Sequence, residues 1–201
     1  MIKNIVFDLG GVLIDWNPRY LFTKVFSKED ELDYFLTEVC SFEWNEEQDA
    51  GRSIEEANKY LADKYPQYRT QIRMYYERWP EMLGGILEEN VRLLERLKEL
   101  TKSRLFALTN WSAETFPLTL ERFEFFGHFE GIVVSGEEKV KKPDDKIYRI
   151  LYDRYHLAPE ECIFIDDNLR NVKAAEVQGM HTIHFVNETD LESELEKRGL
   201  L

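Results

Sequence analysis

The sequence has no hydrophobic run long enough to cross a membrane, and it has only two cysteines in 201 residues. The apolar run near the N-terminus is short and is interrupted by Asp8, which argues against a signal peptide. Cys40 and Cys162 lie far apart along the chain, and so low a cysteine content is typical of a reducing compartment. We therefore expect a cytoplasmic protein without a structural disulfide.

The chain also lacks an excess of positive charge. It has 26 Lys and Arg against 39 Asp and Glu, a formal net charge of −13. Nucleic acids and anionic membranes select basic surfaces, so we expect neither as a partner. A small anionic substrate is still compatible, because a local site on an acidic protein can be positive. Nothing in the sequence indicates an oligomeric state.

Apolar residues are plentiful and follow an alternating pattern. The chain is 43% hydrophobic and 13% aromatic, enough for a sizeable core. Short apolar runs predict strands, and amphipathic segments between them predict helices. The expected strands are 5–7, 105–108, 132–134, 162–165 and 182–186, and the expected helices are 87–100, 146–155, 172–177 and a last one started by Thr189 with Glu192. This alternation is typical of the α/β class with a doubly wound parallel sheet.

Residues 16–83 break the alternation. They contain four helical stretches: 18–26, 27–39, one begun by a capping box of Ser53 and Glu56, and 66–79. A polar segment, 41–52, is expected as a loop between the second and the third. Because this block follows the first strand, we expect a helical-bundle cap (16–83) over the core (1–15 and 84–201). Gly84 and Gly85 are expected to form a hinge or turn.

Polar side chains follow four of the predicted strands. They are Asp8, then Thr109 and Asn110, then the pair Lys141 and Lys142 in a polar loop (135–143), then Asp166 and Asp167. The carboxyl ends of parallel strands meet at one edge of a sheet, so these groups should lie together. Three carboxylates at one place need a cation, and Mg²⁺ prefers oxygen ligands.

The other groups at this edge suit a phosphate. Thr109 offers a hydroxyl and Asn110 an amide to a phosphate oxygen, and a lysine supplies positive charge. Gly10 and Gly11 let the backbone pass close to a ligand. A carboxylate that is free of structural contacts is then available as a nucleophile. In the polar cap segment, Arg52 is a candidate for contact with another part of the substrate.

Four stretches resemble, in order, the motifs of the haloacid dehalogenase-like (HAD) superfamily: Phe-Asp-Leu-Gly-Gly-Val-Leu, Leu-Thr-Asn, Lys-Lys-Pro-Asp and Phe-Ile-Asp-Asp-Asn. The helical insert is similar to the small, C1-type cap of that superfamily. The resemblance implies a Rossmann-like core that binds Mg²⁺. It also implies roles for single residues: Asp8 as nucleophile, Thr109 as phosphate binder, Lys142 as the motif lysine, and Asp8, Asp166, Asp167 and the Gly10 carbonyl as metal ligands.

One position departs from the resemblance. Most phosphatases of the superfamily carry a second Asp two residues after the nucleophile as general acid and base, and here Gly10 stands there. A similar Asp-Leu-Gly variant occurs in a bacterial subgroup that includes α-glucose-1-phosphate phosphatase. Losing a positioned acid typically costs ~10²–10⁴ in rate. We therefore expect substrates with good leaving groups, such as anomeric sugar phosphates, or another acid, for which Asp15 is the nearest candidate.

Three functions are compatible with the sequence. The leading prediction is a Mg²⁺-dependent phosphatase that hydrolyses a small phosphorylated metabolite through an aspartyl-phosphate on Asp8. A 2-haloacid dehalogenase would use the same Asp8 on carbon, but that chemistry needs no metal and would leave Asp166 and Asp167 without a use. A non-catalytic binding or regulatory domain is supported only by Gly10.

Overall fold

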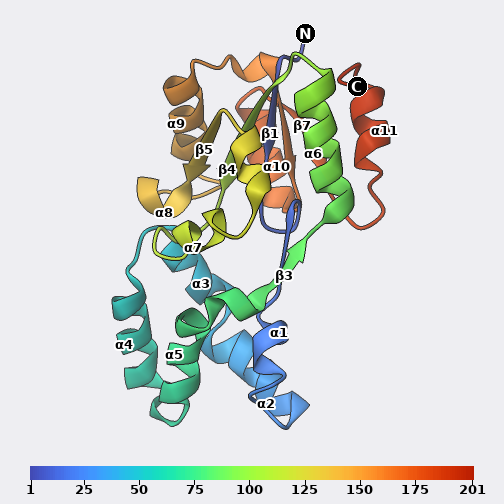
Figure 1. Cartoon of the computed structure of the whole chain (residues 1–201). Coiled ribbons are helices and arrows are strands. Elements are labelled where there is room, and N and C mark those ends of the chain that lie inside the picture. Colours follow the sequence, from blue (N-terminus) through green and yellow to red (C-terminus); the bar gives the residue numbers. More distant parts are fainter.

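The computed structural model describes all residues 1–201 and contains a five-stranded, all-parallel sheet. The strand order is β5–β4–β1–β6–β7 (Figure 1). These strands are β1 (Asn4–Phe7), β4 (Arg104–Thr109), β5 (Gly131–Val134), β6 (Cys162–Asp166) and β7 (His181–His184). The predicted doubly wound α/β class is confirmed. The sheet reverses its direction of growth beside β1, which is where ligands bind in such folds.

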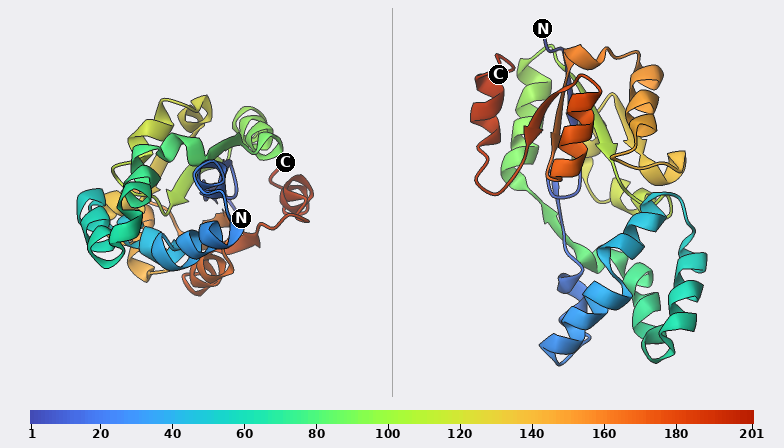
Figure 2. Two further views of the ribbon diagram at one scale, coloured as in Figure 1. Left: turned by 90° about the horizontal axis from the view of Figure 1, so that it is seen from below. Right: turned by 180° about the vertical axis from the view of Figure 1, so that it is seen from behind.

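Helices cover both faces of the sheet (Figures 1 and 2). On one face lie α6 (Glu88–Leu100), α7 (Phe116–Leu120) and α11 (Leu191–Glu196), and on the other lie α9 (Asp145–Tyr155) and α10 (Leu169–Val177). Ile5 and Phe7 pack with the first group, whereas Val6 packs with the second. Because both faces are buried, residues 5–7 of β1 form a continuous apolar run in the sequence.

The cap consists of short helices beyond the carboxyl ends of the strands, at the end of the molecule opposite the two termini (Figure 1). Its helices are α1 (Arg19–Phe22), α2 (Glu29–Tyr34) with a π-helical continuation (Phe35–Val39), α3 (Phe42–Asp49), α4 (Ile54–Lys64) and α5 (Arg69–Glu77). Phe22, Phe35 and Tyr75 are almost fully buried at its centre. None of the helices of the protein is both long and apolar enough to span a membrane.

The prediction of a loop at 41–52 is wrong, because most of this segment is the helix α3. Ser41 caps it, accepting a hydrogen bond from the backbone N–H of Trp44 at 3.3 Å. The buried residues of α3 include Asn45, Gln48 and Asp49. A helix that buries polar side chains has no apolar periodicity, so the signal that identifies most helices is missing here.

The prediction of a hinge or turn at Gly84 and Gly85 is also wrong. Both residues belong to β3 (Leu83–Ile86), which pairs antiparallel with β2 (Ile14–Trp16). This two-stranded ribbon joins the cap to the sheet (Figure 1). The expected boundaries between cap and core, 15/16 and 83/84, fall inside it. Two glycines give no strand signal of their own, and their pairing partner lies far away along the chain.

Two smaller differences concern helix starts. The expected polar loop at 135–143 begins with a short helix, α8 (Ser135–Glu138). The last helix, α11, is capped by Asp190, whose carboxylate accepts from the backbone N–H of Ser193 at 3.0 Å. Thr189 lies outside this helix and accepts instead from the backbone N–H of Val186 at 2.9 Å.

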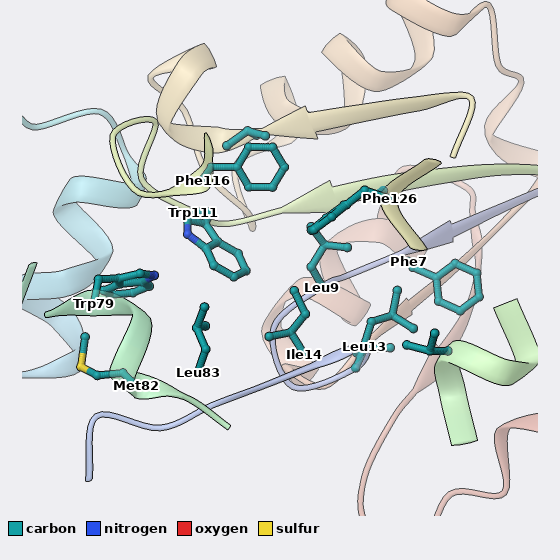
Figure 3. Packing of buried hydrophobic residues seen from close by; sticks show 14 of the residues in the cluster. Phe7, Leu9, Leu13, Ile14, Trp79, Met82, Leu83, Trp111, Phe116 and Phe126 are labelled. Atoms are coloured by element: carbon teal, nitrogen blue, oxygen red, sulfur yellow. The ribbon is translucent and has the colours of Figure 1, made fainter. Parts of the chain in front are cut away.

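The cap and the core share one hydrophobic cluster. Trp79 of the cap stacks on Trp16 of β2, with ring centroids 5.6 Å apart, and meets Trp111 edge-on at 6.2 Å. Trp111 follows β4, and Figure 3 shows it between Trp79 on one side and Leu9 of the core on the other. Such aromatic contacts bury large areas, so the cap is held closely over the end of the sheet.

Candidate active site

Asp8 follows β1 directly and is buried, with 8% of its surface exposed. Its Oδ1 accepts from the backbone N–H of Leu9 at 2.7 Å and pairs with Lys142 Nζ at 2.9 Å. Its Oδ2 accepts no hydrogen bond from the protein. Asp8 is therefore held by one oxygen and presents the other to the pocket that it lines.

Lys142 is the inward-pointing member of the lysine pair, and its side chain is fully buried. Its Nζ contacts Asp8 Oδ1, Asp166 Oδ2 at 2.7 Å and the Leu108 carbonyl at 2.8 Å. Burial lowers its pKa, but the charges of Asp166 and Asp8 outweigh this effect and raise the pKa above its ordinary value. The ammonium group therefore stays charged. Lys141 points elsewhere and pairs with Glu46 of the cap at 2.8 Å.

Asn110 and Thr109 serve different purposes. The side-chain amide of Asn110 donates to the Lys142 carbonyl at 3.0 Å, and its Oδ1 accepts from the Lys142 backbone N–H at 2.8 Å. Both polar atoms of Asn110 thus hold the backbone of Lys142, and its amide keeps a second N–H on the side of the residue that lines the pocket. Thr109 Oγ1 is buried at the end of β4 without any hydrogen-bond partner. A buried hydroxyl without a partner is costly unless a ligand satisfies it.

The two aspartates at the end of β6 also differ. Asp166 is fully buried, pairs with Lys142, accepts from Asn171 Nδ2 at 3.1 Å on both oxygens and accepts from the Asn168 backbone at 2.7 Å. Asp167 lines the pocket beside Asp8. Asn171 orients Asp166 by donating to both of its oxygens.

The carboxylates of this site carry more negative charge than the site neutralises. One oxygen from each of Asp8, Asp166 and Asp167 lies within 4.8 Å of the others, and Lys142 is the cation they share. Burial raises the pKa of Asp8 well above its ordinary value, Lys142 opposes this shift, and Asp166 and Asp167 reinforce it. When all three carboxyl groups are ionised, Lys142 leaves two negative charges unbalanced. An oxygen-only donor set with that excess fits a hard divalent cation.

Gly10 and Gly11 have different structural requirements. Gly11 has a φ of +72°, and a Cβ atom there would lie 2.3 Å from Asp167 Oδ2. A glycine is therefore needed at position 11 for both conformation and space. A Cβ atom added at Gly10 would have no neighbouring atom within 4 Å. Position 10 lines the pocket with room for a side chain, and the sequence places none there.

The pocket has a volume of about 340 Å³ and lies between cap and core. The residues that line it from the core include Asp8, Gly10, Asn110, Trp111, Asp167, Asn168 and Asn171. From the ribbon and the cap come Trp16, Phe42, Asn45, Glu46, Asp49 and Trp79. The ribbon and the cap therefore contribute three aromatic side chains, one amide and two carboxyl groups, and the amide and both carboxyl groups come from α3.

Two candidates from the sequence do not line this pocket. Arg52 donates from Nε to Gln48 Oε1 at 2.7 Å and from Nη2 to the Trp44 carbonyl at 3.1 Å, so these contacts lie within the cap. Asp15 accepts from the Tyr20 hydroxyl at 2.6 Å and lines an adjoining, more open hollow of about 840 Å³, which shares Gly11, Trp16 and Asp167 with the pocket. Sequence reasoning instead missed Asp49, because the segment that contains it was interpreted as a loop.

The arrangement belongs to a recognisable class of hydrolase: a parallel α/β sheet with a carboxylate after its central strand, a buried lysine beside it and an acidic pair on the neighbouring strand. Residues 2–179 match the family model of the haloacid dehalogenase-like hydrolases. The chain belongs to this family.

Two relatives of known activity match most of the chain. It is 27% identical over 215 residues to the D-ribitol-5-phosphate phosphatase of Bacteroides thetaiotaomicron, covering 97% of each chain. It is 26% identical over 187 residues to a sesquiterpene phosphatase of Aspergillus oryzae, covering 92% of this chain and 90% of the relative.

Solved structures agree on the fold. A HAD family enzyme of Bacteroides thetaiotaomicron in complex with magnesium and inorganic phosphate superimposes with a TM-score of 0.72 at 24% identity, covering 96% of this chain and 99% of the other. The L-2-haloacid dehalogenase of Xanthobacter autotrophicus superimposes with a TM-score of 0.65 at 17% identity, covering 100% and 85%. Because an enzyme bound to magnesium and phosphate and a dehalogenase both match, the fold does not choose between phosphate and halide chemistry.

Proposed function

We propose that this protein is a Mg²⁺-dependent phosphatase that acts on a small phosphorylated metabolite through an aspartyl-phosphate on Asp8. The observation that carries the proposal is the state of Asp8, which is fixed through Oδ1 by Lys142 while Oδ2 stays free in the pocket. A carboxylate held in this way is suited to nucleophilic attack. The phosphatase names of the relatives that match most of the chain support the same assignment.

Each group of the core has a place in this reaction. Asp8 Oδ2 attacks phosphorus, and Lys142 offsets charge on the transferred group while it holds Asp8. Thr109 Oγ1, buried without a partner, donates to a phosphate oxygen. Asp166 and Asn110 position Lys142 through its side chain and its backbone.

The carboxylates of Asp8, Asp166 and Asp167, with the backbone carbonyl of Gly10, would hold the Mg²⁺ ion. The site fits the ion because its donors are all oxygen and its charge is uncompensated. When bound, the ion supplies positive charge to the phosphoryl group and to the acidic cluster.

The pocket limits the leaving group. At about 340 Å³ and with three aromatic side chains from the ribbon and the cap, it fits a small organic group with an apolar face better than a protein or nucleic acid. A sugar ring has such a face, so an anomeric sugar phosphate is one candidate substrate within this class.

A phosphate-release assay tests the proposal. The wild type should release phosphate from p-nitrophenyl phosphate only with Mg²⁺, and Asp8→Asn should abolish the release while its unfolding temperature stays similar. Halide release from 2-chloropropionate without metal, and no phosphate release, would instead identify a dehalogenase. The absence of both activities would leave a binding protein.

A further inference from the structure

The pocket lacks an acid at the position where space is left for one. An added Cβ at Gly10 would meet nothing within 4 Å, and Gly10 lines the pocket beside Asp8. When the P–O bond to the leaving group breaks, the departing oxygen gains negative charge. A positioned acid that protonates this oxygen typically contributes ~10²–10⁴ in rate. Another carboxyl group in the pocket could take this role.

Four carboxyl groups line the pocket, and three are already committed. Asp8 and Asp167 belong to the acidic cluster that shares Lys142. Glu46 is bound by two cations, Lys141 at 2.8 Å and Arg170 at 3.0 Å, so both of its oxygens are already paired. Asp49 is the remaining carboxyl group.

Asp49 is the last residue of α3 and is 8% exposed. Its one side-chain hydrogen bond is a long one, from Asn45 Nδ2 to Oδ2 at 3.4 Å, and no cation bonds to it. Burial and the charge of Glu46 raise the pKa of Asp49 to about 7, although Lys141, the Ser112 backbone and Lys142 act in the opposite direction. A carboxyl group in this state both gives and takes a proton near neutral pH.

A chain of hydrogen bonds orients Asp49 from inside the cap. Arg52 donates to Gln48, whose amide donates to the Tyr76 hydroxyl at 2.8 Å. The hydroxyl in turn donates to Asn45 Oδ1 at 2.9 Å. This bond fixes the Asn45 amide with its N–H side toward Asp49. Arg52 thus lies at the far end of the chain from Asp49 and acts on the pocket only through it.

The helix that carries Asp49 is docked on the core. Glu46, one turn earlier in α3, makes ion pairs with Lys141 and with Arg170 at the start of α10. Both partners lie close in sequence to residues of the acidic site. The ion pairs therefore place this helix over the carboxyl ends of the strands, and the carboxyl group of Asp49 shares one pocket with Asp8.

We propose that Asp49 is the general acid and base of this enzyme, a catalytic residue that the cap supplies in place of one at position 10. The proposal rests on the phosphatase function proposed above. As Asp8 Oδ2 bonds to phosphorus, the P–O bond to the leaving group breaks, its electron pair stays on the leaving oxygen, and Asp49 gives that oxygen its proton. Water then attacks phosphorus and gives a proton to Asp49, and the electron pair of the breaking bond returns to Asp8.

The test compares two substrates of similar shape. Phenyl phosphate has a more basic leaving group than p-nitrophenyl phosphate and depends more on protonation. Asp49→Asn should lower kcat for phenyl phosphate by ~10²-fold and for p-nitrophenyl phosphate by less than ~10-fold. In the wild type, kcat for phenyl phosphate should fall above pH about 7, and this dependence should be absent from the variant. The pH dependence of the wild type tests the proposal even if the Asp49→Asn variant does not fold.

Two matched variants serve as controls. Asp15→Asn changes a carboxyl group outside the pocket and should leave both rates unchanged. Arg170→Gln removes one of the two ion pairs that dock the cap and should lower both rates by the same factor. Two results would overturn only the role proposed for Asp49 and would leave the phosphatase proposal standing. One is an equal loss of rate on both substrates in Asp49→Asn. The other is a wild-type rate for phenyl phosphate that does not change from pH 6 to 9. A wild type that releases no phosphate from either substrate would overturn the phosphatase proposal itself.

Discussion

The core and the cap place aspartates in one pocket but in opposite surroundings. Asp8 of the core contacts a buried ammonium group at 2.9 Å, whereas Asp49 of the cap contacts a neutral amide at 3.4 Å. Burial raises the pKa of both carboxyl groups, but Lys142 opposes this shift at Asp8 by direct contact, whereas no cation bonds to Asp49. One residue type thus suits attack at one wall of the pocket and proton transfer at the other.

The largest effect should come from removing the cation of the core. Lys142→Met leaves Asp8 and Asp166 buried without their shared partner, and losing one member of a buried ion pair costs about 3–5 kcal/mol of unfolding free energy. Mg²⁺ should recover part of this loss by binding the folded state. Chemical denaturation with and without Mg²⁺ measures both effects.

Lys141→Met is the matched control. It breaks only the partly exposed pair with Glu46 and should cost less than about 1 kcal/mol. If both variants are equally stable, the buried ion pair is not what distinguishes the core side of the pocket.

The next largest effect tests whether the two positions for an acid are interchangeable. Gly10→Asp, made in an Asp49→Asn background, should restore hydrolysis of phenyl phosphate by about 10-fold or more, because the position is open and borders the pocket. Steady-state kcat for the double variant gives the answer. Gly10→Asn in the same background should restore nothing, and a rescue by asparagine would contradict proton transfer.

A smaller effect should appear in the pH dependence of stability. The pKa of Asp49 is about 7 in the folded state and about 3.9 in an unfolded chain, so the folded state binds more protons between these values. The contribution of Asp49 to the free energy of unfolding therefore falls as pH rises through this window. The free energy of unfolding of Asp49→Asn, compared with that of the wild type, should therefore increase by about 2 kcal/mol from pH 5 to pH 8.

Urea unfolding of both proteins at several pH values measures this difference. Subtracting the free energy of unfolding of the wild type from that of the variant isolates the contribution of Asp49. Glu46, Lys141 and Lys142 face the same carboxyl group and are unchanged in the comparison. A difference that stays constant across the range would mean that Asp49 ionises normally in the folded state.

The smallest effect should come from the orienting chain in the cap. Tyr76→Phe removes the hydroxyl that joins Gln48 to Asn45 and should cost about 1 kcal/mol of stability. It should lower kcat for phenyl phosphate by a few-fold and leave p-nitrophenyl phosphate nearly unchanged. Equal changes on both substrates would show that the hydroxyl only stabilises the cap.

More of the structure and of the site residues could be predicted from sequence for the core than for the cap. Apolar strands that end in Asp8, Thr109 and Asp166 are local signals, and the parallel sheet brings their ends together by geometry alone. The cap residues carry no such signal. Helix α3 buries Asn45 and Gln48, and their partner Tyr76 lies in another helix, so no local pattern shows that these side chains bond together.

The amino-acid sequence by itself determined the α/β class, the helical insert and the group of polar residues at the strand ends, because each depends on hydrophobic periodicity or on strand termini. Only the tertiary structure decided which lysine points inward, that Asn110 holds Lys142, and that Arg52 and Asp15 lie outside the pocket. It also brought Asp49 of the cap into the pocket of Asp8. The physical reason is that burial and ion pairing depend on contacts between residues far apart in the chain, and those contacts set the charge of each carboxyl group.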